Sequence, residues 1–285
     1  MKKYTLFTLM LALGLFLYSC EEKANGGETD KETEETNEEV VKEEAPKTEM
    51  SWEKDGLKVY ALEGSPAYED ATLSLTTPPV GVDLDAGENL FSFNVENYEL
   101  GQQTADAETK GMANSPKGQH IHFILNNGPY SAQYDPEFKK ELEDGHYVLL
   151  AFLARSYHES VKNGKAAVIQ QFVVGQPDNY QEADLNAAHM FYSRPKGSYK
   201  AGDYDKLLLD FYLANVDLSP EGYKVRATIN GVEFTFTKWM PYVIEGLEAG
   251  ELTVKLELLD GEGNLVDSPF NPVERSVTLE APVEG

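Results

Sequence analysis

Apolar and polar residues alternate in short runs along most of the chain, as in β-strands that bury one face. In one run, Phe91, Phe93 and Val95 share a face. Only residues 135–143 have a pattern that an isolated helix would also fit. The clearest alternating runs are residues 57–62, 71–75, 89–95, 120–125, 147–154 and 167–174. The pattern predicts an all-β protein.

The second half of the chain repeats the first. Residues 208–218 match 90–100 without a gap, and residues 224–231 match 120–127. Internal similarity at a period of roughly a hundred residues indicates two copies of one domain. Two units with about seven short strands each, separated by turn residues, suit tandem immunoglobulin-like β-sandwiches. The alternative is one continuous, larger sandwich.

The net charge of the chain limits the classes of molecule that it can bind. The formal net charge is -25, from 49 acidic and 24 basic residues. Such a chain repels nucleic acid and anionic lipid, so we expect no nucleic-acid partner. The single cysteine, Cys20, has no second cysteine with which to form an intramolecular disulfide.

The first twenty residues have the order of an export signal. Lys2 and Lys3 precede an apolar run at 6–17 that is too short to span a membrane comfortably, and the run ends in Leu-Tyr-Ser-Cys at 17–20. This ending resembles the lipobox of bacterial lipoproteins, which implies lipidation of Cys20 and a membrane anchor. The alternative is an ordinary signal peptide with an incidental cysteine.

An acidic segment follows the signal. Residues 21–50 hold twelve acidic residues and four lysines and almost no apolar ones. They cannot bury enough surface to offset their ordering entropy, so we expect a disordered tether. Glu21 and Glu22 resemble the acidic export signal of Bacteroidota surface lipoproteins, which implies anchoring to the outer membrane, on its surface or periplasmic face.

These observations define the expected organisation. We predict a lipoprotein signal peptide at 1–19, a disordered acidic tether at 20–50, a first β-sandwich at 51–175, a linker at 176–188 and a second β-sandwich at 189–285. Proteolysis within the linker is expected to release two folded pieces.

The repeat predicts which way the side chains of the first unit point. By comparison with the apolar positions of residues 224–231, Ile121 and Phe123 should face the core. His120 and His122 alternate with them and should point outward. Residues 147–154 should pair with this strand in antiparallel fashion, which returns His158 to the neighbourhood of His120. His146 falls at the opposite end, near the turn at 126–127.

Three converging imidazoles are candidate ligands for a transition metal. We predict that His120, His122 and His158 bind Zn or Cu, with Glu159 or Met112 as an extra ligand. Only neutral imidazoles bind, so affinity is expected to fall below about pH 6.5, the ordinary histidine pKa. The alternative is that the histidines are ordinary polar residues on a solvent-facing strand.

Two resemblances accompany this pattern. His120, His122, Gly145-His146 and His158 resemble the histidines of small His-rich periplasmic immunoglobulin-like domains of unknown function. The mature chain also resembles Bacteroidota lipoproteins sometimes labelled "phosphopeptide-binding protein", which implies phosphopeptide binding. Both resemblances point to a binding protein of the cell envelope.

The sequence does not favour an enzyme. Ser156, His158 and Glu159 lie too close along the chain to aim at one another as a relay. We therefore predict a non-catalytic, lipid-anchored binding protein for a metal or small ligand. The alternative is an interaction lipoprotein that docks an envelope protein or a glycan on exposed aromatic residues, namely Tyr130, Tyr134, Tyr157 and Trp239. Val148, Leu150 and Phe152 form an outward apolar strip, which packs on the second unit or the linker, or marks an interface.

Overall fold

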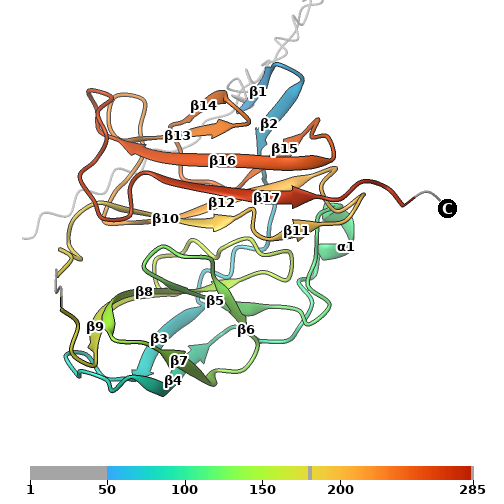
Figure 1. Cartoon of the computed structure of the whole chain (residues 1–285). Coiled ribbons are helices and arrows are strands. Elements are labelled where there is room, and N and C mark those ends of the chain that lie inside the picture. Colours follow the sequence, from blue (N-terminus) through green and yellow to red (C-terminus); the bar gives the residue numbers. More distant parts are fainter. Residues whose placement is uncertain (1–49, 179–181, 284–285) are drawn as a thin grey trace, which may run out of the picture. The chain divides into compact units, whose positions relative to one another are not determined.

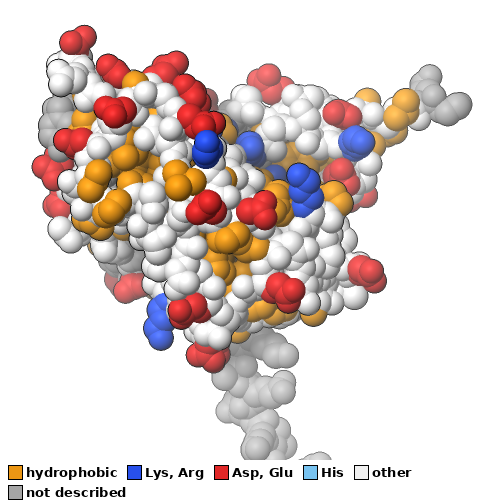
Figure 2. Space-filling model, turned by 90° about the horizontal axis from the view of Figure 1, so that it is seen from below, with side chains coloured by type: hydrophobic (Ala, Val, Ile, Leu, Met, Phe, Trp, Pro, Cys, Tyr) orange, Lys and Arg blue, Asp and Glu red, His pale blue; other side chains and the backbone are white. Residues whose placement is uncertain are grey.

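The computed structural model describes residues 50–178 and 182–283 (Figure 1). The expected signal peptide, Cys20 and all but the last residue of the expected tether lie outside this part of the chain. Within it, no helix is long and apolar enough to cross a membrane. Figure 2 shows acidic side chains spread over one face of the molecule, with few basic ones between them.

The first sandwich consists of a three-stranded and a four-stranded sheet. The first sheet has the order β3 (Thr72–Thr77), β4 (Gly87–Glu96), β7 (Glu137–Leu142). The second has the order β6 (Ser131–Gln133), β5 (His120–Leu125), β8 (Gly145–Ala154), β9 (Ala167–Val174). Phe91, Phe93, Ile121 and Phe123 meet in the core between the sheets, as the alternation predicts.

The second sandwich repeats this strand order. Its first sheet runs β10 (His189–Arg194), β12 (Leu207–Ala214), β15 (Tyr242–Glu245), β2 (Leu57–Ala61), β1 (Ser51–Lys54). Its second sheet runs β14 (Val232–Phe236), β13 (Lys224–Ile229), β16 (Gly250–Leu259), β17 (Val273–Leu279), β11 (Ser198–Tyr199). The order β10-β12-β15 matches β3-β4-β7, and β14-β13-β16-β17 matches β6-β5-β8-β9. The chain is therefore an all-β protein of two tandem β-sandwiches, as predicted.

The strands β1 and β2 differ from the expectation. The sequence placed them in the first domain, but β2 pairs with β15 of the second, with Val59 opposite Ile244. Leu57 and Val59 are buried in the core of the second sandwich. Alternation along this segment predicts a strand and its buried face, but it does not determine the sheet that the strand joins.

The segment whose sequence pattern also fitted a helix forms a strand in the structure. Residues 135–143 contain β7, where Phe138 contacts Phe91 with ring centroids 5.9 Å apart. The helix among the described residues is the four-residue α1 (Ala107–Lys110). It lies between the alternating runs at 89–95 and 120–125.

The two sandwiches meet face to face. Val148, Leu150 and Phe152 on β8 form a buried cluster with Phe191 and Tyr212 of the second sandwich. The side chains of Phe152 and Tyr212 stack with centroids 5.0 Å apart. The outward apolar strip on β8 therefore packs against the second sandwich, which confirms that interpretation. His120 and His122 of β5 also lie on this side of the first sandwich, where His122 contacts Ser193 of β10.

Candidate metal centre

Two of the three histidines project from β5 into the layer between the sandwiches. His120 is paired with Ala154 and His122 with Phe152 on β8, so the expected antiparallel register is present. Both histidine residues are fully buried (0% exposed). The interpretation of a solvent-facing strand is therefore wrong, because β10 covers this face: His122 Nδ1 lies 3.1 Å from Ser193 Oγ.

The third histidine comes from a turn that follows β8. His158 N donates to Arg155 O, and Arg155 N donates to Glu159 O, both at 2.8 Å. His158 has a φ of 71°, a left-handed conformation that a non-glycine residue adopts uncommonly. A buried ion pair of 2.9 Å between Arg155 and Glu159 braces the turn. The turn thereby directs the His158 ring back over His120.

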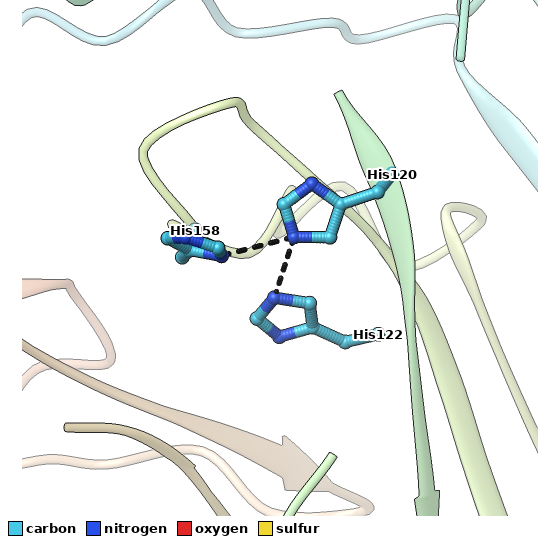
Figure 3. A group of neighbouring side chains, drawn as sticks. All are labelled: His120, His122 and His158. Carbon is cyan, nitrogen blue, oxygen red and sulfur yellow. Dashed lines mark hydrogen bonds between the residues drawn. The ribbon is translucent and has the colours of Figure 1, made fainter. Parts of the chain in front are cut away.

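The three rings converge on one point (Figure 3). His120 Nε2 lies 3.0 Å from His122 Nε2 and 3.0 Å from His158 Nδ1. One nitrogen of each ring lies within 4.8 Å of the others. Two nitrogens bound to one tetrahedral zinc at about 2.0–2.1 Å are roughly 3.3 Å apart. The two separations of 3.0 Å are close to the spacing that a shared ion requires.

The outer nitrogens of two rings are fixed by hydrogen bonds. His120 Nδ1 lies 2.8 Å from Gly118 O. A carbonyl oxygen only accepts, so Nδ1 of a neutral His120 carries the proton and Nε2 presents its lone pair. The single lone pair of His120 Nε2 faces the ring nitrogens of both other histidines. A metal ion bound by all three nitrogens would explain this arrangement. Gly118 O and Ser193 Oγ are outer contacts of the kind that orient metal-binding histidines.

The surroundings keep the rings neutral. Burial lowers the pKa of His120 from 6.5 to about 4. Burial also lowers the pKa values of His122 and His158 well below 6.5, and the nearby charge of Arg194 lowers both further. Protons therefore compete with a metal only at a pH well below 6.5, in contrast to the expectation for ordinary histidines.

The two extra ligands proposed from the sequence lie elsewhere. The Glu159 carboxylate bonds Ser65 Oγ at 2.6 Å through one oxygen and Arg155 through the other. Met112 packs in an apolar cluster with Tyr157 and Leu208. Both expectations are wrong, because neighbouring segments already engage these side chains.

The remaining histidines are separate from the centre. His146 lies at the other end of β8, where its carbonyl accepts from Asn126 Nδ2 at 2.9 Å, as predicted. His189 Nδ1 lies 2.8 Å from Ser268 Oγ, and its Nε2 lies 2.8 Å from Asp184 O. These residues provide controls for variants of the other three histidines.

One residue beside the centre was misread from the sequence. Tyr130 is only 5% exposed, and its ring stacks on His122 with centroids 3.6 Å apart. Its hydroxyl oxygen lies 3.2 Å from His158 Nδ1 and accepts from Arg194 Nη1 at 3.0 Å. Arg194 belongs to the second sandwich, and no sequence signal links it to Tyr130.

The prediction that the aromatic residues form an exposed docking surface is also wrong for most of them. Tyr157 is fully buried (0% exposed), as Tyr130 nearly is. Trp239 is partly buried and packs edge-on against Tyr212, with centroids 4.9 Å apart. Tyr134 lies against His120 with centroids 5.1 Å apart. These rings fill the layer between the sandwiches and its margins.

Comparisons with known proteins assign neither a family nor a function. No protein-family model matches the sequence, and no curated protein matches it. Among solved structures, fibronectin(III)-like modules of Clostridium thermocellum CbhA share 12% identity over 73% of this chain and 94% of theirs, with a TM-score of 0.26. The two tandem V-type regions of VCBP3, a v-region-containing chitin binding protein, share 9% over 74% of this chain and 100% of theirs, with a TM-score of 0.22. SGBP-B of the Bacteroides ovatus mixed-linkage glucan utilization locus, in complex with a mixed-linkage heptasaccharide, shares 9% over 77% of this chain and 71% of its own, with a TM-score of 0.23. Scores this low carry no argument, so the fold assignment rests on the observed strand order.

Proposed function

We propose that this chain is a non-catalytic binding protein that holds one transition-metal ion, Zn or Cu, between its two β-sandwiches. The observation that carries the proposal is the approach of three imidazole nitrogens, two from fully buried histidines and one from the partly buried His158. Two pairs of these nitrogens are 3.0 Å apart. Three neutral imidazoles suit either metal. Because His122 is anchored by Ser193 of β10, an ion bound there supports the contact between the sandwiches as well.

The burial of the site supports binding over catalysis. His120 and His122 are fully buried, and Tyr130 and Phe152 cover the remaining sides of His122. A catalytic metal keeps an open position for water or substrate, whereas a structural metal is enclosed by its ligands. The burial of His120 and His122 matches that of a structural metal site.

Titration calorimetry with Zn(II) and with Cu(II) tests the proposal. The full chain should bind one equivalent, and His120→Ala and His158→Ala should each abolish binding. His146→Ala, at the other end of β8, is the matched control and should bind like the natural chain. Absence of binding to the natural chain, or equal binding by His120→Ala, would contradict the proposal.

We further propose that the protein is anchored to the outer membrane of the cell envelope by lipid at Cys20. The support is the lipobox at 17–20 and the acidic residues that follow it. The natural chain should enter the detergent phase on phase partition, and Cys20→Ala should stay in the aqueous phase. If both forms remain aqueous, the anchor is ruled out.

A further inference from the structure

The positive charges beside the histidines raise a question of electrostatic balance. Arg194 is buried and Lys196 is partly buried, and both lie close enough to His122 and His158 to lower their pKa values. Within residues 50–178 and 182–283, neither cation forms an ion pair with a carboxylate, and Arg194 Nε has no hydrogen-bond partner. A divalent ion placed among neutral imidazoles would add two more positive charges at this position. A buried arrangement of this kind requires an anion.

Tyr130 is placed to supply that anion. Its hydroxyl oxygen accepts from Arg194 Nη1 at 3.0 Å, and Lys196 Nζ lies 4.4 Å from the centre of its ring. Lys196 Nζ also donates to the Tyr130 carbonyl at 2.7 Å, which fixes the backbone of the residue. Two cations of the second sandwich thus hold one tyrosine of the first.

The position of the hydroxyl also fits that of a ligand. Tyr130 Oη lies 3.2 Å from His158 Nδ1, beside two nitrogen pairs of 3.0 Å. The ligand atoms of a tetrahedral zinc at about 2.0–2.1 Å are roughly 3.3 Å apart. The Tyr130 and His122 rings stack nearly in parallel, at an interplanar angle of 10°, which holds the tyrosine ring beside this histidine.

From these contacts we infer that Tyr130 is the fourth protein ligand and binds the metal through its phenolate oxygen, to which Arg194 donates a hydrogen bond. The inference rests on the proposed metal binding and deepens it. A bound metal would take the place of the phenolic proton, which would pass to solvent, and the resulting phenolate would offset the charge of the cations. Three imidazoles and one phenolate complete a four-coordinate site made entirely of protein groups, which is the arrangement of structural metal centres.

Absorption spectroscopy during Cu(II) titration tests the inference. A phenolate bound to Cu(II) gives an intense charge-transfer band in the visible range, which imidazoles alone do not give. The natural full chain should develop this band in proportion to bound copper, up to one equivalent. Tyr130→Phe should lose the band and bind copper roughly tenfold or more weakly, a loss of the size seen when a supporting group of a metal site is removed.

Tyr134→Phe is the matched control. Tyr134 also contacts His120, but its hydroxyl lies 2.7 Å from Ser115 Oγ. This variant should keep the band and the affinity. The spectrum of the natural chain decides the question even if Tyr130→Phe does not fold. Stoichiometric copper without the band overturns the inference and leaves the proposed function standing, as does a Tyr130→Phe variant with an unchanged band. Absence of any copper or zinc binding by the natural chain overturns both.

Discussion

Replacing Asp210 with alanine tests how firmly the two sandwiches are joined beside the histidines. Asp210 lies on β12 and is fully buried (0% exposed). Its carboxylate accepts from Ser160 N at 3.2 Å and from Ser160 Oγ at 3.1 Å. It also forms an ion pair with Lys162, whose side chain is 13% exposed. Alanine removes all of these contacts and leaves the Lys162 ammonium group without its counter-ion.

Breaking a buried ion pair by removing one partner costs about 3–5 kcal/mol. We expect Asp210→Ala to lower the free energy of unfolding, measured by urea titration, by an amount in this range. Zinc affinity should fall as well, because Ser160 follows His158 by only two positions. Glu88→Ala is the matched control, since the ion pair of Glu88 with Lys139 has side chains 58% and 62% exposed, and its stability should be unchanged. Equal unfolding free energies for the two variants would refute the reasoning.

Three further predictions concern pH, packing and chain connectivity. The folded-state pKa of His120 is lowered from 6.5 to about 4, so the unfolded chain takes up the proton first. His120 should therefore contribute a loss of about 3 kcal/mol of stability in the metal-free protein as pH falls from 7 through 4, and an unchanged pH profile in His120→Asn would contradict this. Phe152→Ala removes a fully buried ring between the sandwiches and should cost about 3–5 kcal/mol in urea unfolding, whereas Leu90→Ala, at a position 40% exposed, should cost far less. In contrast to the release of two pieces expected from the sequence, proteolysis within residues 176–188 should leave both pieces in one complex on size-exclusion chromatography, because β2 stays paired with β15. Separate elution of the pieces would count against the observed pairing.

Part of the centre is predictable from the sequence because a strand repeats every two residues. Ile121 and Phe123 are apolar and must face the core, so His120 and His122 must share the opposite face. The internal repeat identifies the strand that pairs with β5 and so predicts the return of His158. Local periodicity and one strand pairing suffice for these placements.

The rest of the centre depends on contacts between segments far apart in the chain. Alternation indicates which face His122 occupies but does not reveal that β10 covers that face. Neither the burial of the histidines nor the contacts of Ser193 and Arg194 can therefore be read from the sequence. Tyr130 illustrates the same limit: it was expected to be exposed, and residues more than sixty positions away bury it and bond to it. The assignment of β1 and β2 failed for the same reason.

Anomalous X-ray scattering from crystals of the full chain grown with Zn(II) tests the metal site most directly. We expect one strong peak in the layer between the sandwiches, about 2.0–2.1 Å from His120 Nε2, His122 Nε2 and His158 Nδ1. Data collected on either side of the zinc absorption edge identify the metal. A peak confined to surface carboxylates, or no peak near these three nitrogens at saturating zinc, would contradict the account.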